Sequence, residues 1–315
     1  MRKGILAVFL FSGTFIVAQS LVGSGYVAPA PASVAPGQIA TFYVAGLNST
    51  TGITATLQQG SVTTTAPVRS VQSVSLCPDV TSVLVSACGS LTAVTVQIPY
   101  ELTPFCPLCA SPVVATPPLL LIGQGGKNTS AFELNPLEDE VHVLSSCDVA
   151  AGGKPAPNYT GLPCAPYVTH SDGTLVSAAS PANAGEGLTA WVFGLGETIP
   201  DGVTGQPAQA APAAEQFYLD FNYSINALPT KPFTSDPDRV PLKPLYAGLA
   251  PGYVGLYQVN FTVPAGPPNG IGRCAPLGTN GPGANVIQSN LTVSIGGQFS
   301  FDGAGICVAT QIPVD

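Results

Sequence analysis

Eight cysteines are the residues of this sequence with the clearest chemistry, since an even number suggests a set of disulfides. Disulfides persist in exported proteins and are rare in the reducing cytoplasm, so the count also indicates the compartment. The sequence alone leaves their connectivity open. Short separations favour four local pairs: Cys77–Cys88, Cys106–Cys109, Cys147–Cys164 and Cys274–Cys307.

One of these pairs, Cys106-Pro107-Leu108-Cys109, has the C-x-x-C spacing that also serves redox and zinc chemistry. Redox use requires a helix amino terminus to lower the thiol pKa, whereas this motif lies among prolines in a strand-rich region. With Cys77 and Cys88 it could supply four thiolates to zinc. A structural disulfide is the favoured interpretation, and we expect no metal or cofactor, although the zinc and redox alternatives stay open.

The two histidines are His142 and His170. The run His170-Ser171-Asp172 contains the residue types of a catalytic triad. Neighbours on an extended chain point to opposite faces, however, so adjacency does not assemble a triad. No G-x-S-x-G turn presents a serine, and His142 between two valines is expected on the outer face of a strand. We therefore predict that the protein has no catalytic residues and is not an enzyme.

Acidic residues gather in two places, the run 138–140 and the pair Asp236 and Asp238 around Pro237. A glycosidase needs paired carboxylates across a cleft, and neither group matches that requirement. Either group could contribute oxygen ligands to Ca²⁺, but the spacing of a calcium-binding loop is missing. We expect solvated loop acids, with the run 138–140 as an exposed turn.

Charge is scarce in this chain: 8% of residues are charged, and the net charge is −8. The few, scattered cations provide no basic surface for nucleic acid or for an anionic membrane. The surface must consist largely of neutral polar residues, which suits an extracellular protein and leaves little repulsion between copies. An apolar content of 45% excludes a disordered chain.

Residues 1–20 have the pattern of a secretory signal peptide. Arg2 and Lys3 precede the apolar stretch 5–17, and small residues follow at Ala18 and Ser20. We expect cleavage after Ser20, with Ala18 as the alternative. No later segment is long and apolar enough to span a membrane, so the mature protein is expected to be secreted or held at the cell surface.

Glycine and proline, 35 and 32 residues, are too frequent for long helices and predict an all-β protein. The chain also repeats itself. Segment 36–47 returns as 184–195, with glycine, threonine, valine, glycine and leucine at the same places, and 94–99 returns as 259–264. A third pair is 113–123 and 286–296. These repeats predict two tandem immunoglobulin-like Greek-key β-sandwiches at 22–147 and 167–315, joined by a Gly/Pro-rich linker at 148–166.

Four segments of the second unit are distinctive: 170–176, 181–186, 246–260 and 301–308. The stretch Ala247-Gly248-Leu249-Ala250-Pro251-Gly252-Tyr253-Val254-Gly255-Leu256-Tyr257-Gln258 is the most specific of them. In these segments the chain resembles a C-terminal domain family of secreted soil-bacterial proteins of acidobacterial type. More distantly it is similar to the IPT/TIG group of immunoglobulin-like domains. The resemblance covers about 167–310 and implies an extracellular module without catalytic residues; the first unit is related to it only through the internal repeat.

The function we expect is therefore that of a non-enzymatic binding or structural protein, which acts by adhesion or by contact with an extracellular polymer or protein surface. One alternative is a carbohydrate-binding protein, for which Trp191, Tyr253 and Tyr257 are the candidate stacking residues, although all three also suit a core. The other alternative is a self-associating fibre or surface-layer subunit, since few like charges oppose pairing of strand edges.

Overall fold

The structure is a computed structural model that describes residues 20–24, 33–75, 90–105, 116–129, 131–146, 148, 165–223, 242–265, 274–277 and 286–309. Every regular element in these ranges is a β-strand, which confirms the all-β prediction. Among the same residues no helix has the length and hydropathy to cross a membrane. The signal peptide lies outside the described residues except Ser20, where strand β1 begins.

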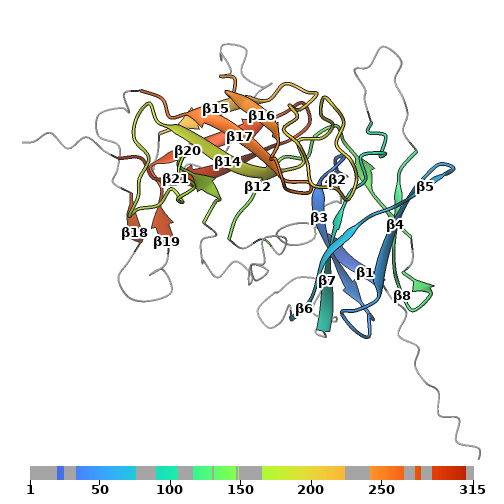
Figure 1. Cartoon of the computed structure of the whole chain (residues 1–315). Helices are drawn as coiled ribbons and strands as arrows, with labels where there is room; N and C mark the ends of the chain where they lie inside the picture. The colour runs from blue at the N-terminus through green and yellow to red at the C-terminus, as the bar shows by residue number, and fades with distance from the viewer. Residues whose placement is uncertain are drawn as a thin grey trace, which may run out of the picture.

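The first sandwich packs two antiparallel sheets over one core (Figure 1). One sheet has the order β1 (Ser20–Ser24), β3 (Ile39–Ala45), β7 (Ser90–Gln97), β6 (Val68–Ser75). The other has the order β10 (Phe132–Glu133), β8 (Leu119–Gln124), β4 (Ile53–Gln59), β5 (Val62–Thr65). These are the A-B-E-D and G-F-C-C′ orders of an immunoglobulin-like Greek key. Phe42, Val94, Leu57, Leu120 and Ile122 meet between the sheets, since alternate side chains of a strand share one face.

The second sandwich repeats this arrangement. Its first sheet has the order β12 (His142–Val143), β14 (Gly187–Phe193), β17 (Tyr257–Thr262), β16 (Tyr246–Leu249), with β13 (Val168–Thr169) also paired to β14. Its second sheet has the order β15 (Tyr218–Asn222), β20 (Leu291–Gly296), β21 (Phe301–Ile306). These are the A-B-E-D and C-F-G orders. Short pairs complete the fold: β2 (Ser33–Val34) with β11 (Asn135–Pro136), β8 with β9 (Lys127–Asn128), and β18 (Ala275–Leu277) with β19 (Val286–Gln288).

The repeated segments occupy equivalent positions in the two sandwiches. β3 and β14 are both second in their sheets, and β7 and β17 are both third. The register also matches, because Thr41 faces Thr95 across one strand pair and Thr189 faces Asn260 across the other. Both pairs are joined by side-chain hydrogen bonds, of 2.9 and 3.2 Å. The outer face of β3 is buried as well as its core face, since Thr41 and Tyr43 are almost inaccessible.

The expected linker does not separate the sandwiches. β12 lies before residues 148–166 and β13 after them, yet both pair with β14. Strands from both sides of residues 148–166 therefore belong to the second sandwich, and the first sandwich ends before β12. Val141 and Val143 draw the chain into the second core because their side chains are buried there. The true connection is 137–140, between Leu137, which donates its N–H to the Val34 carbonyl, and Val141.

Of the four expected disulfides, Cys274–Cys307 is confirmed, with 5.3 Å between the Cα atoms. It ties the segment that leads into β18 to the end of β21. Cys77, Cys88, Cys106, Cys109, Cys147 and Cys164 lie outside the described residues, and so do Asp236 and Asp238. Next to the expected third pair, Ser146 and Ala165 are joined by two hydrogen bonds of 2.9 Å.

Tyr100 is the centre of the joint between the two sandwiches. It follows β7, and its ring lies against Gly37 of the first sandwich and Gly202 of the second, where a Cβ on either glycine would overlap the ring. Its hydroxyl is 3.2 Å from the hydroxyl of Tyr257, which is fully buried. The Tyr257 hydroxyl donates to the Gly196 carbonyl at 2.6 Å, so the Tyr100 hydroxyl is left to donate to Tyr257.

The long loop between β14 and β15 closes this joint from the other side. Thr204 Oγ1 accepts the Tyr100 N–H at 2.9 Å and donates to the Glu101 carboxylate at 2.7 Å. The Gly205 N–H donates to Gln97 Oε1 at 2.7 Å. The opposite end of the first sandwich, where β4 begins and β8 ends, extends away from the second sandwich (Figure 1). The joint thus fixes one end of the first sandwich and leaves the other end free.

We predict that Gly202→Ala weakens the joint, because the new Cβ enters the space of the Tyr100 ring. Overpacking of this kind costs about 1–3 kcal/mol. The free energy of unfolding in urea and small-angle scattering measure the loss of stability and the loss of the fixed angle. Gly187→Ala is the matched control, since nothing lies within 4 Å of its Cβ position. Equal stability and equal scattering for both variants would show that the joint is not held by Tyr100.

Candidate functional site

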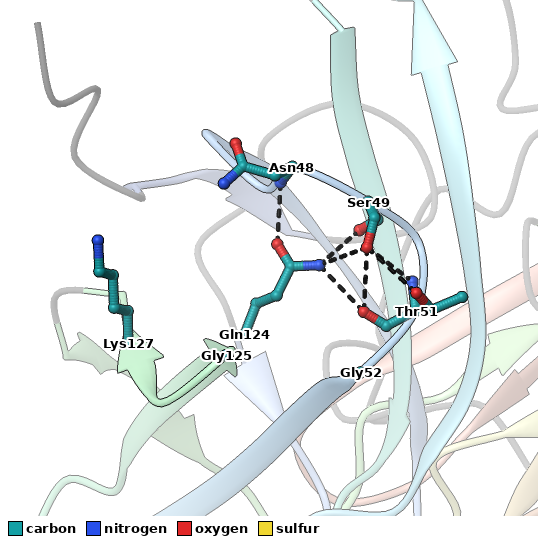
Figure 2. A pocket seen from close by; sticks show the side chains of 7 residues that line it. All are labelled: Asn48, Ser49, Thr51, Gly52, Gln124, Gly125 and Lys127. Atoms are coloured by element: carbon teal, nitrogen blue, oxygen red, sulfur yellow. Dashed lines mark hydrogen bonds between the residues drawn. The ribbon is translucent and has the colours of Figure 1, made fainter. Parts of the chain in front are cut away.

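A pocket of about 400 Å³ lies at the free end of the first sandwich (Figure 2). Two loops form it: the connection between β3 and β4 and the turn between β8 and β9. In an immunoglobulin-like fold these are the B–C and F–G loops, which lie side by side at one end. The lining residues are Asn48, Ser49, Thr51, Gly52, Gln124, Gly125 and Lys127.

The F–G turn is set by two glycines. Gln124 and Lys127 are paired across the β8–β9 hairpin, so Gly125 and Gly126 form a two-residue turn. Their φ angles are 58° and 77°, which L side chains rarely adopt and a tight hairpin of this type requires at both positions. The backbone of Lys127 therefore has a fixed place at the edge of the pocket.

Gln124 holds the B–C loop in shape. Its Oε1 accepts the Asn48 N–H at 2.9 Å, and its Nε2 donates to the carbonyls of Ser49 and Thr51, each at 3.0 Å. The Ser49 hydroxyl adds a contact of 2.8 Å to the same Nε2 (Figure 2). Among the described residues the B–C loop has no strand partner of its own, and the side chain of Gln124 supplies its backbone hydrogen bonds instead. The pocket is therefore preorganised for binding.

The lining groups are amides, hydroxyls, backbone and one amine, without a carboxylate or an aromatic ring. The volume is within the range of small-ligand sites. This chemistry favours a polar ligand over an apolar one. The site was not predicted from the sequence; the Gly125-Gly126 turn is a usable signal, but nothing local shows that Gln124 reaches residues more than 70 positions earlier.

The three aromatic candidates from the sequence fall into different places. Tyr257 is buried in the joint, so its proposed role as a stacking residue is wrong. Trp191 is half-buried on the outer face of β14, and Tyr253 is 56% exposed beside it. Their ring centroids are 6.2 Å apart with an angle of 59° between the planes, which is a tilted pair rather than a coplanar row. Trp191 Nε1 donates to Thr169 Oγ1 at 3.2 Å, leaving the ring face as its free surface for contact.

His170 lies between an acid and a serine. Its Nδ1 is 2.5 Å from Glu186 Oε1, and its Nε2 is 3.2 Å from Ser180 Oγ. Asp172, the acid expected from the adjacent run, instead accepts hydrogen bonds from Thr174 within an exposed turn. The hydrogen bond to Glu186 raises the pKa of His170. Ser180, His170 and Glu186 therefore contact one another in the same order as the residues of a Ser–His–Glu triad.

Three features argue against nucleophilic catalysis by Ser180. His170 Nε2 is also 3.1 Å from the Ser180 carbonyl, so this nitrogen carries a proton and cannot accept one from the hydroxyl. The Ser180 N–H is already donated to Ser177, and the next residue, Pro181, has no N–H to stabilise an oxyanion. His170 instead ties the bend at 177–180 to the start of β14.

His142 lies on the outer face of β12, since Val141 and Val143 on either side of it belong to the core, but two carboxylates cover this face. Its Nε2 is 3.0 Å from Asp148 Oδ2 and its Nδ1 is 3.1 Å from Asp302 Oδ2, and its side chain is 17% exposed. Burial lowers the pKa of His142, but hydrogen bonds and charges of Asp148 and Asp302 outweigh it and raise the pKa to about 9. Asp148 also accepts the N–H of Ser145 at 2.6 Å. This cluster is a structural clamp across the edge of the second sandwich.

The acidic run 138–140 is the connection between the sandwiches, not the solvated turn that we expected. Asp139 is fully buried. Its carboxylate accepts the N–H groups of Phe299 and Ser300 at 2.9 and 3.0 Å, which compensates for the loss of water. Burial nevertheless raises its pKa to about 6, and burial beside Asp139 raises that of Glu140 to about 7. Burial and a hydrogen bond with Glu138 raise the pKa of Glu215 to about 9. Within the described ranges no group of three or more His, Cys, Asp or Glu could hold a metal ion.

Neither a comparison with protein-family models nor a search of curated proteins finds a match to this chain. The resemblance to IPT/TIG-like domains, drawn from segments such as 246–260 and 301–308, stays a prediction.

We predict that the protein is more stable at pH 5 than at pH 9. The raised pKa values of Asp139, Glu140 and Glu215 mean that the folded chain holds protons that the unfolded chain releases. The free energy of unfolding therefore falls as the pH rises from about 4.5 towards 9. The raised pKa of His142 acts in the same direction, since its contribution is complete below 6.5 and lost as the pH passes about 9.

Thermal unfolding followed by circular dichroism at pH 5, 7 and 9 measures this trend as a Tm that falls by several degrees. Glu215→Gln should flatten the profile, whereas the exposed Glu133→Gln should leave it unchanged. A Tm that rises steadily with pH contradicts the prediction.

Proposed function

We propose that this chain is a secreted or cell-surface protein without catalytic activity, which binds an extracellular polymer or protein surface as an adhesion or matrix-contact module. The observation that carries the proposal is the different use of one loop in two equivalent sandwiches. In the second sandwich the B–C loop holds the joint through Thr204 and Gly205. In the first sandwich the same loop is free and forms the pocket with Gln124.

This asymmetry suits a protein that presents one end to a partner. The second sandwich provides a rigid base, since Tyr100, Tyr257 and the connection 137–140 limit rotation at the joint. Export is supported by the Cys274–Cys307 disulfide, which is typical of oxidising compartments. A binding end of this kind needs no reactive side chain. In the Ser–His–Glu group of the described residues, His170 Nε2 carries a proton and cannot accept one from Ser180.

We predict that the purified mature protein is retained by at least one class of extracellular polymer. The protein is incubated alone, with insoluble polysaccharides and with immobilised matrix proteins. The fraction that sediments is then measured. Reduced and alkylated protein is the control for non-specific adsorption.

Large particles of the protein alone would favour self-assembly, for which the charge-free edge strand β5, with Val62 57% exposed, offers a surface. Absence of retention, together with fluorophosphonate labelling that Ser180→Ala removes, would replace the binding function with a hydrolase.

A carbohydrate-binding protein is the second candidate, and the Trp191–Tyr253 pair favours it. Trp191 is the single tryptophan of the chain, and it is half-buried on the outer face of the sheet, so part of its apolar surface remains in water. Gln258 faces Trp191 on the neighbouring strand, and Asn260 pairs with Thr189 one step along it. An aromatic face flanked by amides can stack on a sugar ring and bond to its hydroxyls.

We predict that soluble oligosaccharides change the fluorescence of Trp191 saturably if this face is used. Because no other tryptophan exists, the signal reports this face alone. Tyr253→Ala should weaken binding about tenfold through loss of the second ring. Tyr218→Ala, in the opposite sheet, is the control and should leave the affinity unchanged. A fluorescence signal that no oligosaccharide alters removes this candidate.

A further inference from the structure

We propose that the pocket at the free end of the first sandwich binds a carboxylate-bearing sugar of an acidic extracellular polysaccharide. The inference rests on the proposed binding function and names the ligand of the site described above. It depends on the charge, the hydrogen-bonding groups and the rigidity of the two loops.

The charge of the pocket is opposite to that of the protein. Lys127 is exposed at the pocket edge, and no ion pair joins it to a described residue. The described carboxylates of the first sandwich are Glu101, bonded to Thr204 at the joint, and Glu133, paired with Leu119. Both carboxylates lie towards the joint, at the end of the first sandwich opposite the pocket. On a chain with a net charge of −8, Lys127 is thus a positive group among neutral ones within the described residues of the free end.

The remaining lining groups suit hydroxyls and carboxylates. The Asn48 amide and the Lys127 amine lie on the other side of Gln124 from Ser49 and Thr51 (Figure 2), outside the bonds that hold the loop. The Lys127 amine and the Asn48 amide can each donate to a carboxylate oxygen, and the Thr51 hydroxyl can exchange a hydrogen bond with a sugar hydroxyl, whereas the Ser49 hydroxyl is engaged with Gln124 and Thr51. A peptide is the poorer fit, because the lining has no apolar side chain against which an apolar side chain of the peptide could pack.

The rigidity of the loops lowers the entropic cost of binding. Gln124 fixes the backbone of residues 48–51 through three hydrogen bonds, and the positive φ angles at Gly125 and Gly126 fix the position of Lys127. A ligand of about one or two sugar rings fits a volume near 400 Å³.

The test compares polygalacturonate with the same polymer after full methyl esterification, which removes the carboxylate and keeps the sugar. We expect the full mature protein to bind polygalacturonate at least about tenfold more tightly, with an affinity that falls as salt is added. Lys127→Gln should abolish this preference. Lys243→Gln, an exposed lysine of the second sandwich, is the matched control and should keep it.

Gln124→Ala provides a second variant, since it frees the B–C loop without removing a charge and should weaken binding while the Tm changes little. Equal binding of both polymers, or a preference that survives Lys127→Gln, overturns the ligand assignment but leaves the binding function standing. Failure to bind polygalacturonate while another polymer or protein is retained has the same meaning. Failure to bind any polymer or protein removes both proposals.

Discussion

The hydrogen bond between Tyr100 and Tyr257 determines how the rest of the molecule is arranged. The Tyr257 hydroxyl is fully buried beside the half-buried Tyr100, and it needs a partner because an unpaired buried hydroxyl costs about 1–3 kcal/mol. Tyr257 satisfies this need by donating to the Gly196 carbonyl, and Tyr100 by donating to Tyr257. Two glycines, Gly37 and Gly202, give the Tyr100 ring its space. Since one partner comes from each sandwich, rotation of one core against the other takes the acceptor away from the Tyr100 hydroxyl.

The repeats in the sequence predicted the strands and their order well, for a physical reason. Strand segments such as 39–45 and 187–193 carry their own instructions, because alternating apolar residues and bounding glycines determine a strand locally. The Cys274–Cys307 disulfide was also accessible, since a short separation favours closure. The fold class therefore followed from local patterns repeated twice.

The features that the sequence did not predict all depend on contacts between distant residues. His142 lies between Asp148 and Asp302, and the second of these is 160 positions away, so strand alternation predicted the outer face but not the two acids that cover it. Gly/Pro-rich composition marked 148–166 as a linker, but the burial of Val141 and Val143 decided where the chain crosses between cores. The pocket depends on Gln124, whose partners lie in another loop. A single sequence holds no record of such pairings.

The positions of the joint and the pocket at opposite ends of β3 and β8 have a consequence for variation between related chains. Substitutions at distant, unconnected positions have nearly additive effects on stability. Changes at Asn48, Thr51 or Lys127 can therefore alter what the free end recognises without loosening Tyr100 from Gly202. The two glycines of the F–G turn are the exception, because any side chain there must adopt an unfavourable φ angle. A lineage of such proteins could exchange one ligand for another while keeping a single frame.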